Sequence, residues 1–105
     1  MSERRREPRK SVDLQVTFRV TESPNATWRN SSHVANLSRY GLFVQTGTLL
    51  SVGTTVSLRI VLPSVGPVEA VAEVRWISED PETTGMGLQF YGETPAALLA
   101  YLESL

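Results

Sequence analysis

The chain contains no cysteine and only one histidine. A disulfide framework and a thiolate zinc site are therefore excluded, and a histidine-rich metal site cannot form. No apolar run approaches the ~20 residues that a transmembrane helix needs. The N-terminal residues are basic, but no apolar stretch follows them as it would in a secretory signal. These absences favour a soluble, cytoplasmic protein with no membrane insertion.

Sequence signals of catalysis are also missing. His33 lies in a polar stretch, and nothing orients it toward a neighbouring serine to form a nucleophile–base pair. The acidic residues at 79–82 flank a proline in a turn-rich segment. They are too few, at the wrong spacing, for a calcium loop. No phosphate loop or GxGxxG run is present. We therefore predict a protein that is not an enzyme and holds neither a metal nor a cofactor.

Length and charge narrow the class further. With 105 residues, of which 41% are hydrophobic, the chain is long enough for one domain with one core. Residues 1–10 hold five basic and two acidic side chains, a net charge of +3. The remaining residues hold five arginines against nine acids, a net charge of −4. A basic arm on an acidic body favours a local anion site over a broad nucleic-acid surface.

Alternation of apolar and polar residues predicts an all-β body. It is strict at residues 12–20, 56–62, 68–77 and 86–90, and weaker strand candidates lie at 27–37 and 42–44. About six short strands separated by turn residues predict a small antiparallel barrel or sandwich. The large side chains expected in its core are Phe18, Phe43, Trp76 and Phe90.

The hydrophobic period changes from two to that of a helix near the C-terminus. Thr94 is expected to cap a short helix with Pro95 at its first position. The apolar residues that would share one face of this helix are Leu98, Tyr101, Leu102 and Leu105. A helix this short needs to dock on the body. The chain thus divides into a flexible basic arm (1–11), a barrel (12–92) and a docked C-terminal helix (93–105).

Two short motifs carry the chemistry that points to a ligand. Arg5 and Arg9 are spaced i, i+4 in an arm that Pro8 keeps extended. A guanidinium group can bind guanine O6 and N7 in bidentate fashion, stack on a base, or pair with phosphate. Two arginines in an extended arm could therefore clamp a flat, anionic, guanine-bearing ligand.

The second motif is Asn36-x-Ser38-x-x-Gly41. The asparagine amide can bind a base edge, and the serine hydroxyl can donate to a base or phosphate oxygen. The glycine allows close backbone approach or a positive φ. Alone, the motif is also typical of an ordinary polar turn. Its position, 27 residues after Arg9 and between two predicted strands, favours a ligand-binding role over an ordinary turn.

The order of these segments resembles the PilZ domain family over nearly all 105 residues. The resemblance rests on RxxxR at 5–9, NxSxxG at 36–41, AEVRW at 72–76 and GMGLQF at 85–90, and is nearest to compact single-domain members of the myxobacterial kind. It implies a six-stranded split barrel with a C-terminal helix that binds cyclic di-GMP. Asn36 stands where the family more often has aspartate, which implies somewhat weaker binding because a charge-assisted bond is lost.

The resemblance also implies residue roles. The primary ligand-binding residues would be Arg5, Arg9, Asn36, Ser38 and Gly41. Secondary candidates are Arg4, Arg6, Arg75 and Trp76. Arg4 and Arg6 would add positive electrostatic potential around the RxxxR motif. Arg4 would also favour the binding of two stacked ligands over one. Arg75 is either a phosphate contact or a solvated strand residue. The alternation favours a core position for Trp76, with stacking on a base as the other reading.

The resulting hypothesis is a cytoplasmic cyclic di-GMP sensor, monomeric or weakly dimeric, that orders its arm on binding and signals to an unidentified protein partner in trans. One alternative is a PilZ-like scaffold that binds proteins and no nucleotide. Another is a small barrel that binds single-stranded nucleic acid, but the acidic body disfavours it because such sites need a basic groove with stacking aromatic residues. We therefore expect no DNA or RNA partner.

Overall fold

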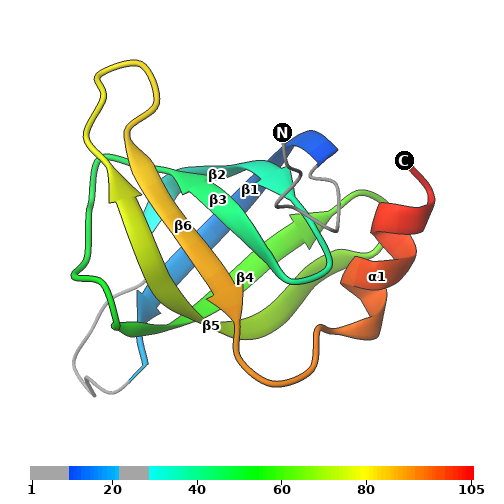
Figure 1. Cartoon of the computed structure of the whole chain (residues 1–105). Coiled ribbons are helices and arrows are strands. Elements are labelled where there is room, and N and C mark those ends of the chain that lie inside the picture. The colour runs from blue at the N-terminus through cyan, green and yellow to red at the C-terminus, as the bar shows by residue number, and fades with distance from the viewer. Residues whose placement is uncertain (1–9, 22–28) are drawn as a thin grey trace, which may run out of the picture.

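The computed structural model describes residues 10–21 and 29–105. These residues form a closed six-stranded antiparallel barrel with a helix at one end (Figure 1), which confirms the fold predicted from the alternation and the resemblance. The elements are β1 (Lys10–Val20), β2 (Arg29–Leu37), β3 (Gly41–Gln45), β4 (Thr55–Leu62), β5 (Gly66–Ser78), β6 (Gly85–Phe90) and α1 (Ala96–Glu103). The order around the barrel is β1-β2-β3-β6-β5-β4, and pairing of β1 with β4 closes it.

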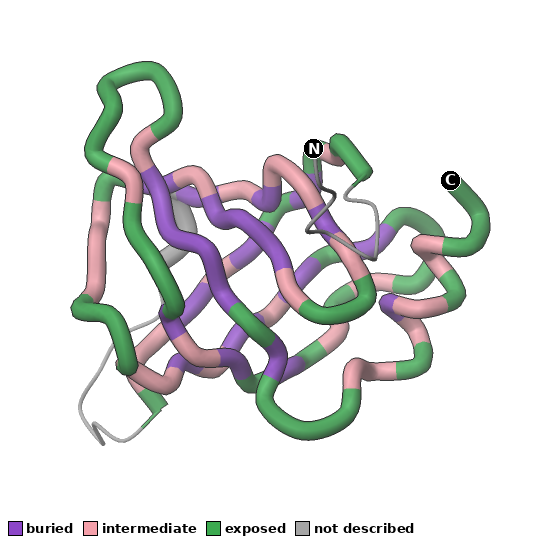
Figure 2. Tube along the Cα trace, viewed as in Figure 1, coloured by how far each residue is buried: buried purple, intermediate pink, exposed green. Residues whose placement is uncertain are grey.

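The barrel interior is built by the inward residues of every strand. In β4 the inward set alternates without interruption, and Val56, Leu58, Ile60 and Leu62 are all buried. The buried positions follow the strands through the barrel wall, whereas the hairpin loops are exposed (Figure 2). Burying one such side chain stabilises the fold by about 1.5–3 kcal/mol. A one-residue slip would turn the whole set outward, so these side chains fix the register.

Two β-bulges reverse the alternation near one end of the barrel. Along β2, Val34 pairs with Val44 but Asn36 pairs with Phe43, so Ala35 is an extra residue. A bulge of this kind turns the following side chains to the opposite face. Asn36 therefore lies on the outer face of the barrel wall, and Leu37 after it is fully buried.

The second bulge lies in β5 and overturns the prediction that Trp76 is a core residue. Val74 pairs with Leu88 but Trp76 pairs with Gly87, so Arg75 is the extra residue. Trp76 consequently points outward and is 41% exposed. The prediction that Phe43 lies in the barrel core was also wrong. Its neighbours Leu42 and Val44 belong to the interior cluster, and Phe43 does not. Phe43 is buried on the outer face, where its ring stacks on that of Trp76.

Helix α1 docks beside the end of the barrel where β1 begins (Figure 1). Leu98 is fully buried, and Tyr101 and Leu102 pack partly against the core. Leu105, predicted on the same face, follows the end of the helix and is 51% exposed.

The start of α1 differs from the prediction made for Thr94. The helix has no side-chain cap. The Thr94 hydroxyl instead donates a hydrogen bond of 2.6 Å to the backbone carbonyl of Arg39. This bond ties the segment that enters the helix to the turn between β2 and β3. In the described part of the chain, no helix combines the length and the apolar character needed to cross a membrane.

Candidate functional site

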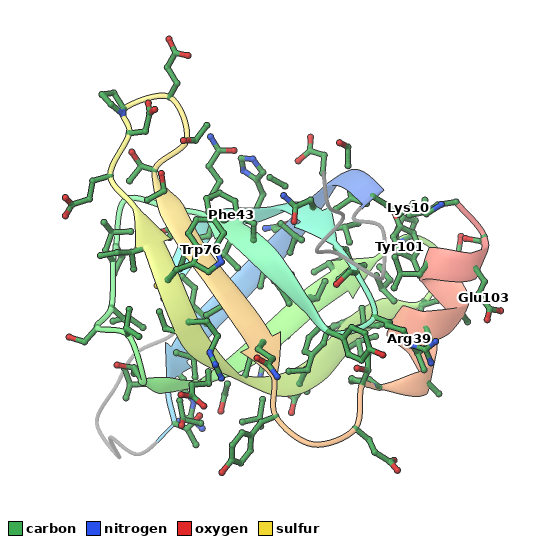
Figure 3. All side chains as sticks on the ribbon, in the orientation of Figure 1. Lys10, Arg39, Phe43, Trp76, Tyr101 and Glu103 are labelled. Carbon is green, nitrogen blue, oxygen red and sulfur yellow. The ribbon has the colours of Figure 1, made fainter. Side chains whose placement is uncertain are left out.

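The two bulges bring four residues into one row across the outer face of the barrel. Asn36 of β2 pairs with Phe43 of β3, Phe43 pairs with Gly87 of β6, and Gly87 pairs with Trp76 of β5. Neighbouring strands lie about 4.8 Å apart, so the row joins the predicted motif residue Asn36 to the aromatic ring of Trp76. Figure 3 shows Trp76 beside Phe43 on this face.

Two glycines in β6 make room for the aromatic pair. A Cβ atom at Gly87 would collide with the indole of Trp76, and one at Gly85 would collide with the ring of Phe43 and the carbonyl oxygen of Val44. Each ring therefore lies over a glycine. The two rings are 5.2 Å apart between centroids and inclined by 22°. Together the two rings form a flat aromatic surface. The Trp76 part of this surface is exposed to solvent, whereas Phe43 is buried.

Ser38 organises the turn that follows Asn36. Its hydroxyl oxygen accepts hydrogen bonds from the backbone N–H groups of Tyr40, at 3.2 Å, and Gly41, at 3.3 Å. The Ser38 N–H in turn donates to the Gly41 carbonyl at 2.9 Å. The hydroxyl proton points toward the same carbonyl across 3.4 Å, a long distance for an O–H···O bond. Ser38 thus holds the turn through its lone pairs while its proton is left only weakly bonded.

Gly41 is required by close backbone approach. A Cβ atom there would collide with the carbonyl oxygen of Leu88 on β6. Of the two explanations offered by the sequence, close approach is therefore the one that the structure supports, because φ at Gly41 is not positive. The motif itself spans the end of β2, the turn, and the first residue of β3.

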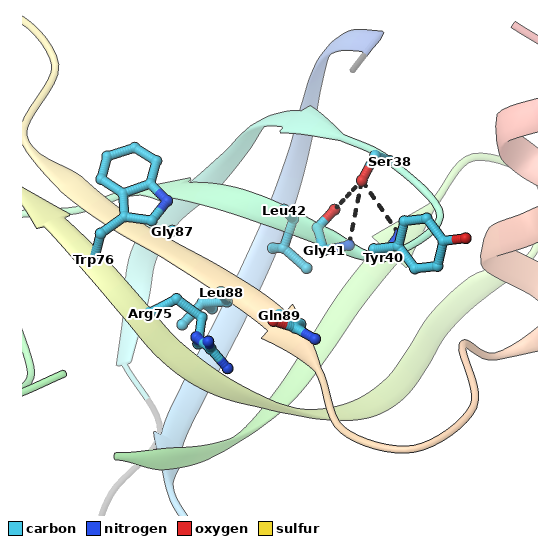
Figure 4. A pocket seen from close by; sticks show the side chains of 9 residues that line it. All are labelled: Ser38, Tyr40, Gly41, Leu42, Arg75, Trp76, Gly87, Leu88 and Gln89. Atoms are coloured by element: carbon cyan, nitrogen blue, oxygen red, sulfur yellow. Dashed lines mark hydrogen bonds between the residues drawn. The ribbon is translucent and has the colours of Figure 1, made fainter. Parts of the chain in front are cut away.

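A cavity of about 210 Å³ lies between this turn and the aromatic pair (Figure 4). Ser38, Tyr40 and Gly41 line one side, and Arg75 and Trp76 line the other. The remaining lining residues are Leu42, Gly87, Leu88 and Gln89. The cavity combines a hydroxyl donor, an exposed guanidinium group and an aromatic ring. This combination suits a planar ligand that carries negative charge.

The structure brings together Asn36, Ser38, Gly41, Arg75 and Trp76 on one face. The arm residues Arg4, Arg5, Arg6 and Arg9 lie outside the described residues. The first described residue is Lys10, which starts β1 and pairs with Leu37, and Ser11 pairs with Asn36. The first strand of the barrel therefore begins directly beside the NxSxxG motif.

No group of three or more histidine, aspartate and glutamate side chains placed to hold a metal occurs within residues 10–21 and 29–105. In the same ranges, the salt bridge between Arg59 and Glu69 lies on the outer face of β4 and β5, 3.2 Å between Nη2 and Oε2. Arg59 does not line the first cavity. Among the described residues, Arg75 is the arginine that does.

The profile of the PilZ domain family matches residues 3–105. The chain belongs to the PilZ domain family. The match includes both motifs and every strand of the barrel. No curated protein sequence matches this PilZ domain significantly.

Solved structures share its fold. The PilZ domain of YcgR from Escherichia coli, determined with c-di-GMP, superimposes with a TM-score of 0.75 at 18% identity, covering 98% of this chain and 92% of that one. MotI/DgrA, an inhibitor of motility from Bacillus subtilis, gives a TM-score of 0.73 at 24% identity and 98% coverage. The MrkH–c-di-GMP complex of K. pneumonia gives 0.69 at 18% identity and 98% coverage. This PilZ domain spans about half the length of MotI/DgrA and MrkH, 49% and 50% respectively.

Sequence reasoning missed Phe43 and Gly87 as parts of this face of the PilZ domain. Gly85 and Gly87 alternate with apolar residues in β6. A glycine inside a strand signals that another group approaches the backbone closely. That signal was present in the sequence, and it could have placed an aromatic ring over the strand.

Proposed function

We propose that this PilZ domain binds cyclic di-GMP on the outer face of the barrel and acts as a non-catalytic effector module. The observation that carries the proposal is the alignment, by two bulges, of Asn36 and Trp76 in one row next to the Ser38 turn. Family membership and the c-di-GMP present in the YcgR and MrkH structures support the choice of ligand.

The cavity supplies contacts for each part of such a ligand. A guanine ring can stack on the open face of Trp76, and base–aromatic stacking contributes about 1–3 kcal/mol per base. The Ser38 hydroxyl can give its proton to a ligand oxygen because its bond to the Gly41 carbonyl is long. The Arg75 guanidinium group can pair with a phosphate through charge-assisted hydrogen bonds, which are stronger than hydrogen bonds between neutral groups.

The arm would cover the ligand from the other side. Arg9 directly precedes Lys10, whose partner Leu37 stands between Asn36 and Ser38 in the chain. Arg5 lies five residues before Lys10, and an extended chain of that length spans at most ~17 Å. In this proposal the arm brings both guanidinium groups toward the cavity. We infer that binding orders the arm, an order–disorder switch, and that a partner protein then recognises the changed surface in trans.

Calorimetric titration of the whole chain with cyclic di-GMP tests the proposal. We expect micromolar or tighter binding that is lost or greatly weakened in Arg5→Ala and Arg9→Ala. The matched control is Arg19→Ala, which removes an arginine from β1 in the opposite half of that strand from Lys10. Absence of heat and of thermal stabilisation at high ligand excess would contradict the proposal. It would leave a protein-binding scaffold as the better reading.

A further inference from the structure

A second cavity borders Trp76 on the outer face of the barrel. It has a volume of about 300 Å³, and Trp76 is the one residue that it shares with the first cavity. Its walls come from the end of β2, from β3, and from the end of β5 with the loop that follows it. The stacked rings of Phe43 and Trp76 give it a flat aromatic side. The proposed function fills the first cavity and leaves this one without an occupant.

The charge and polarity of the second cavity favour a cation. Glu82 is the one charged side chain among the described residues that line it, and the other polar groups there are neutral amides and hydroxyls. The face of an indole ring is electron-rich and also attracts a cation, most often an arginine. A guanidinium group could therefore pair with Glu82 and stack on the aromatic side at once. A phosphate would instead meet a like charge.

The carboxylate of Glu82 is not used to build the loop between β5 and β6. The Asp80 carboxylate accepts from the Glu82 N–H at 3.0 Å, and the Asp80 carbonyl accepts from the Thr84 hydroxyl at 2.8 Å. The Ser78 and Thr83 hydroxyls bond to each other at 3.3 Å. Within the described parts of the chain, Glu82 forms no salt bridge. Other groups thus hold the loop, and the Glu82 carboxylate can take a cation from elsewhere.

The basic arm joins the barrel at the edge of this cavity. Ser11 of β1 pairs with Asn36, which lines the cavity, and Asn36 pairs in turn with Phe43. Residues 1–9 precede this point and contain four arginines, at positions 4, 5, 6 and 9. Neighbouring strands lie about 4.8 Å apart, which places Phe43 roughly 10 Å from Ser11 across the sheet. Arg6 stands five residues before Ser11, and an extended chain of that length spans at most ~17 Å. The arm therefore has both the charge and the reach to occupy the cavity.

We propose that, in the absence of ligand, the arginine segment at 4–6 docks on the second cavity and places a guanidinium group against Glu82 and Trp76. The consequence for regulation rests on the proposed function. An arm that is docked there is not free to cover the first cavity, so docking competes with cyclic di-GMP. The apparent affinity then falls in proportion to the fraction of molecules in which the arm is free. Glu82 would thus be an autoinhibitory residue, whose removal strengthens ligand binding.

NMR spectra of the ligand-free, ¹⁵N-labelled whole chain test the docking itself. The variant combines Arg4→Ala, Arg5→Ala and Arg6→Ala, which removes the guanidinium groups of the segment. We expect the amide signal of Thr83 and the indole N–H signal of Trp76 to shift relative to the wild type, because both groups belong to residues that line the second cavity.

The same triple substitution is then made in two further backgrounds. In a Glu82→Gln chain it should cause shifts that are smaller by roughly half or more, because loss of the ion pair has already lowered the docked population. Glu79→Gln is the matched control, since it makes the same charge change in a residue that does not line the cavity. In that background the triple substitution should cause the full shifts.

Calorimetric titration with cyclic di-GMP tests the competition. Glu82→Gln should tighten binding by about 2- to 5-fold, the value of one exposed ion pair expressed as a ratio of affinities. Glu79→Gln should stay close to the wild-type affinity, because an exposed charge away from the cavity is screened by salt. Unchanged or weaker binding in Glu82→Gln would overturn the autoinhibitory role. Equal tightening in both variants would assign the effect to general charge and overturn it as well.

The outcomes separate this inference from the proposed function. If the triple substitution shifts the cavity signals equally in the wild-type and Glu82→Gln backgrounds, or does not shift them, the docking is wrong while the proposed function stands. If the coupling to Glu82 is found but the wild-type chain does not bind cyclic di-GMP, the docking stands and both the proposed function and the competition are wrong.

Discussion

Gly87→Ala tests whether the outer aromatic surface is the floor of the ligand site. The substitution adds one methyl group at the point where the indole of Trp76 lies over β6, and that Cβ atom would collide with the ring. The backbone of β6 is paired on both sides, with β3 and with β5, so the strand cannot move away. The indole has to leave its position against Phe43.

The size of the effect follows from two contributions. Loss of the stacked Phe43–Trp76 pair costs about 0.5–1.5 kcal/mol, and overpacking of a fitted contact costs about 1–3 kcal/mol. Because a displaced ring escapes into solvent, we expect a net destabilisation of about 1–3 kcal/mol, which lowers Tm by at least ~4 °C in a domain of this size. If a base stacks on Trp76, the affinity for cyclic di-GMP should fall by roughly 5- to 150-fold.

Gly47→Ala is the matched control. A Cβ atom at Gly47 meets nothing within 4 Å, and its φ is not positive. This substitution should leave affinity unchanged and Tm unchanged or slightly raised. Thermal unfolding and calorimetry measure both variants, and near-ultraviolet circular dichroism in a Trp28→Phe background reports the movement of Trp76. If Gly87→Ala matches Gly47→Ala in Tm, spectrum and affinity, the reasoning about the aromatic surface is wrong.

Three further substitutions examine the turn, the helix and the bond between them. Ser38→Ala removes the acceptor of two backbone N–H groups and should cost about 1 kcal/mol of stability. It should also weaken cyclic di-GMP binding, and unchanged denaturant unfolding together with unchanged calorimetry would contradict both roles. Leu98→Ala truncates a fully buried side chain, for which we expect a loss of about 2–5 kcal/mol and faster amide exchange throughout α1. Slow exchange in α1 despite the truncation would show that other contacts hold the helix. Thr94→Val deletes the hydrogen bond to the Arg39 carbonyl and should cost about 0.5–1.5 kcal/mol in urea unfolding, while Thr94→Ser, which keeps the hydroxyl, should stay near the wild-type value.

The strands of the barrel could be predicted from the sequence because each buries one face. In β4 and β6, alternation placed Leu58, Ile60, Met86 and Phe90 inward, and all four are buried. Such a pattern is a direct consequence of the two-residue period of a strand. Residue types and spacing also singled out Ser38 and Gly41, which line the first cavity, and their part in ligand binding stays a prediction.

The bulges could not be predicted in the same way. The alternation in β5 runs without a visible break through Val74 and Trp76, so the pattern places the tryptophan inside. The extra residue shows itself only when β5 is paired with β6, where Trp76 meets Gly87. Likewise, a Thr-Pro pair predicts a helix cap locally, but the partner of Thr94 is a carbonyl 55 positions earlier in the chain. Contacts distant in sequence decided both cases.

Titration of the ¹⁵N-labelled chain with cyclic di-GMP, followed by its amide and indole NMR signals, maps which face of the barrel binds the ligand. We expect saturable shifts that are largest at Ser38, Gly41, Gly87 and the indole N–H of Trp76, because these groups surround the first cavity. Shifts confined to the outer face of β4, around Ser57 and Arg59, or no shifts at all, would contradict the claim that this face is the ligand site.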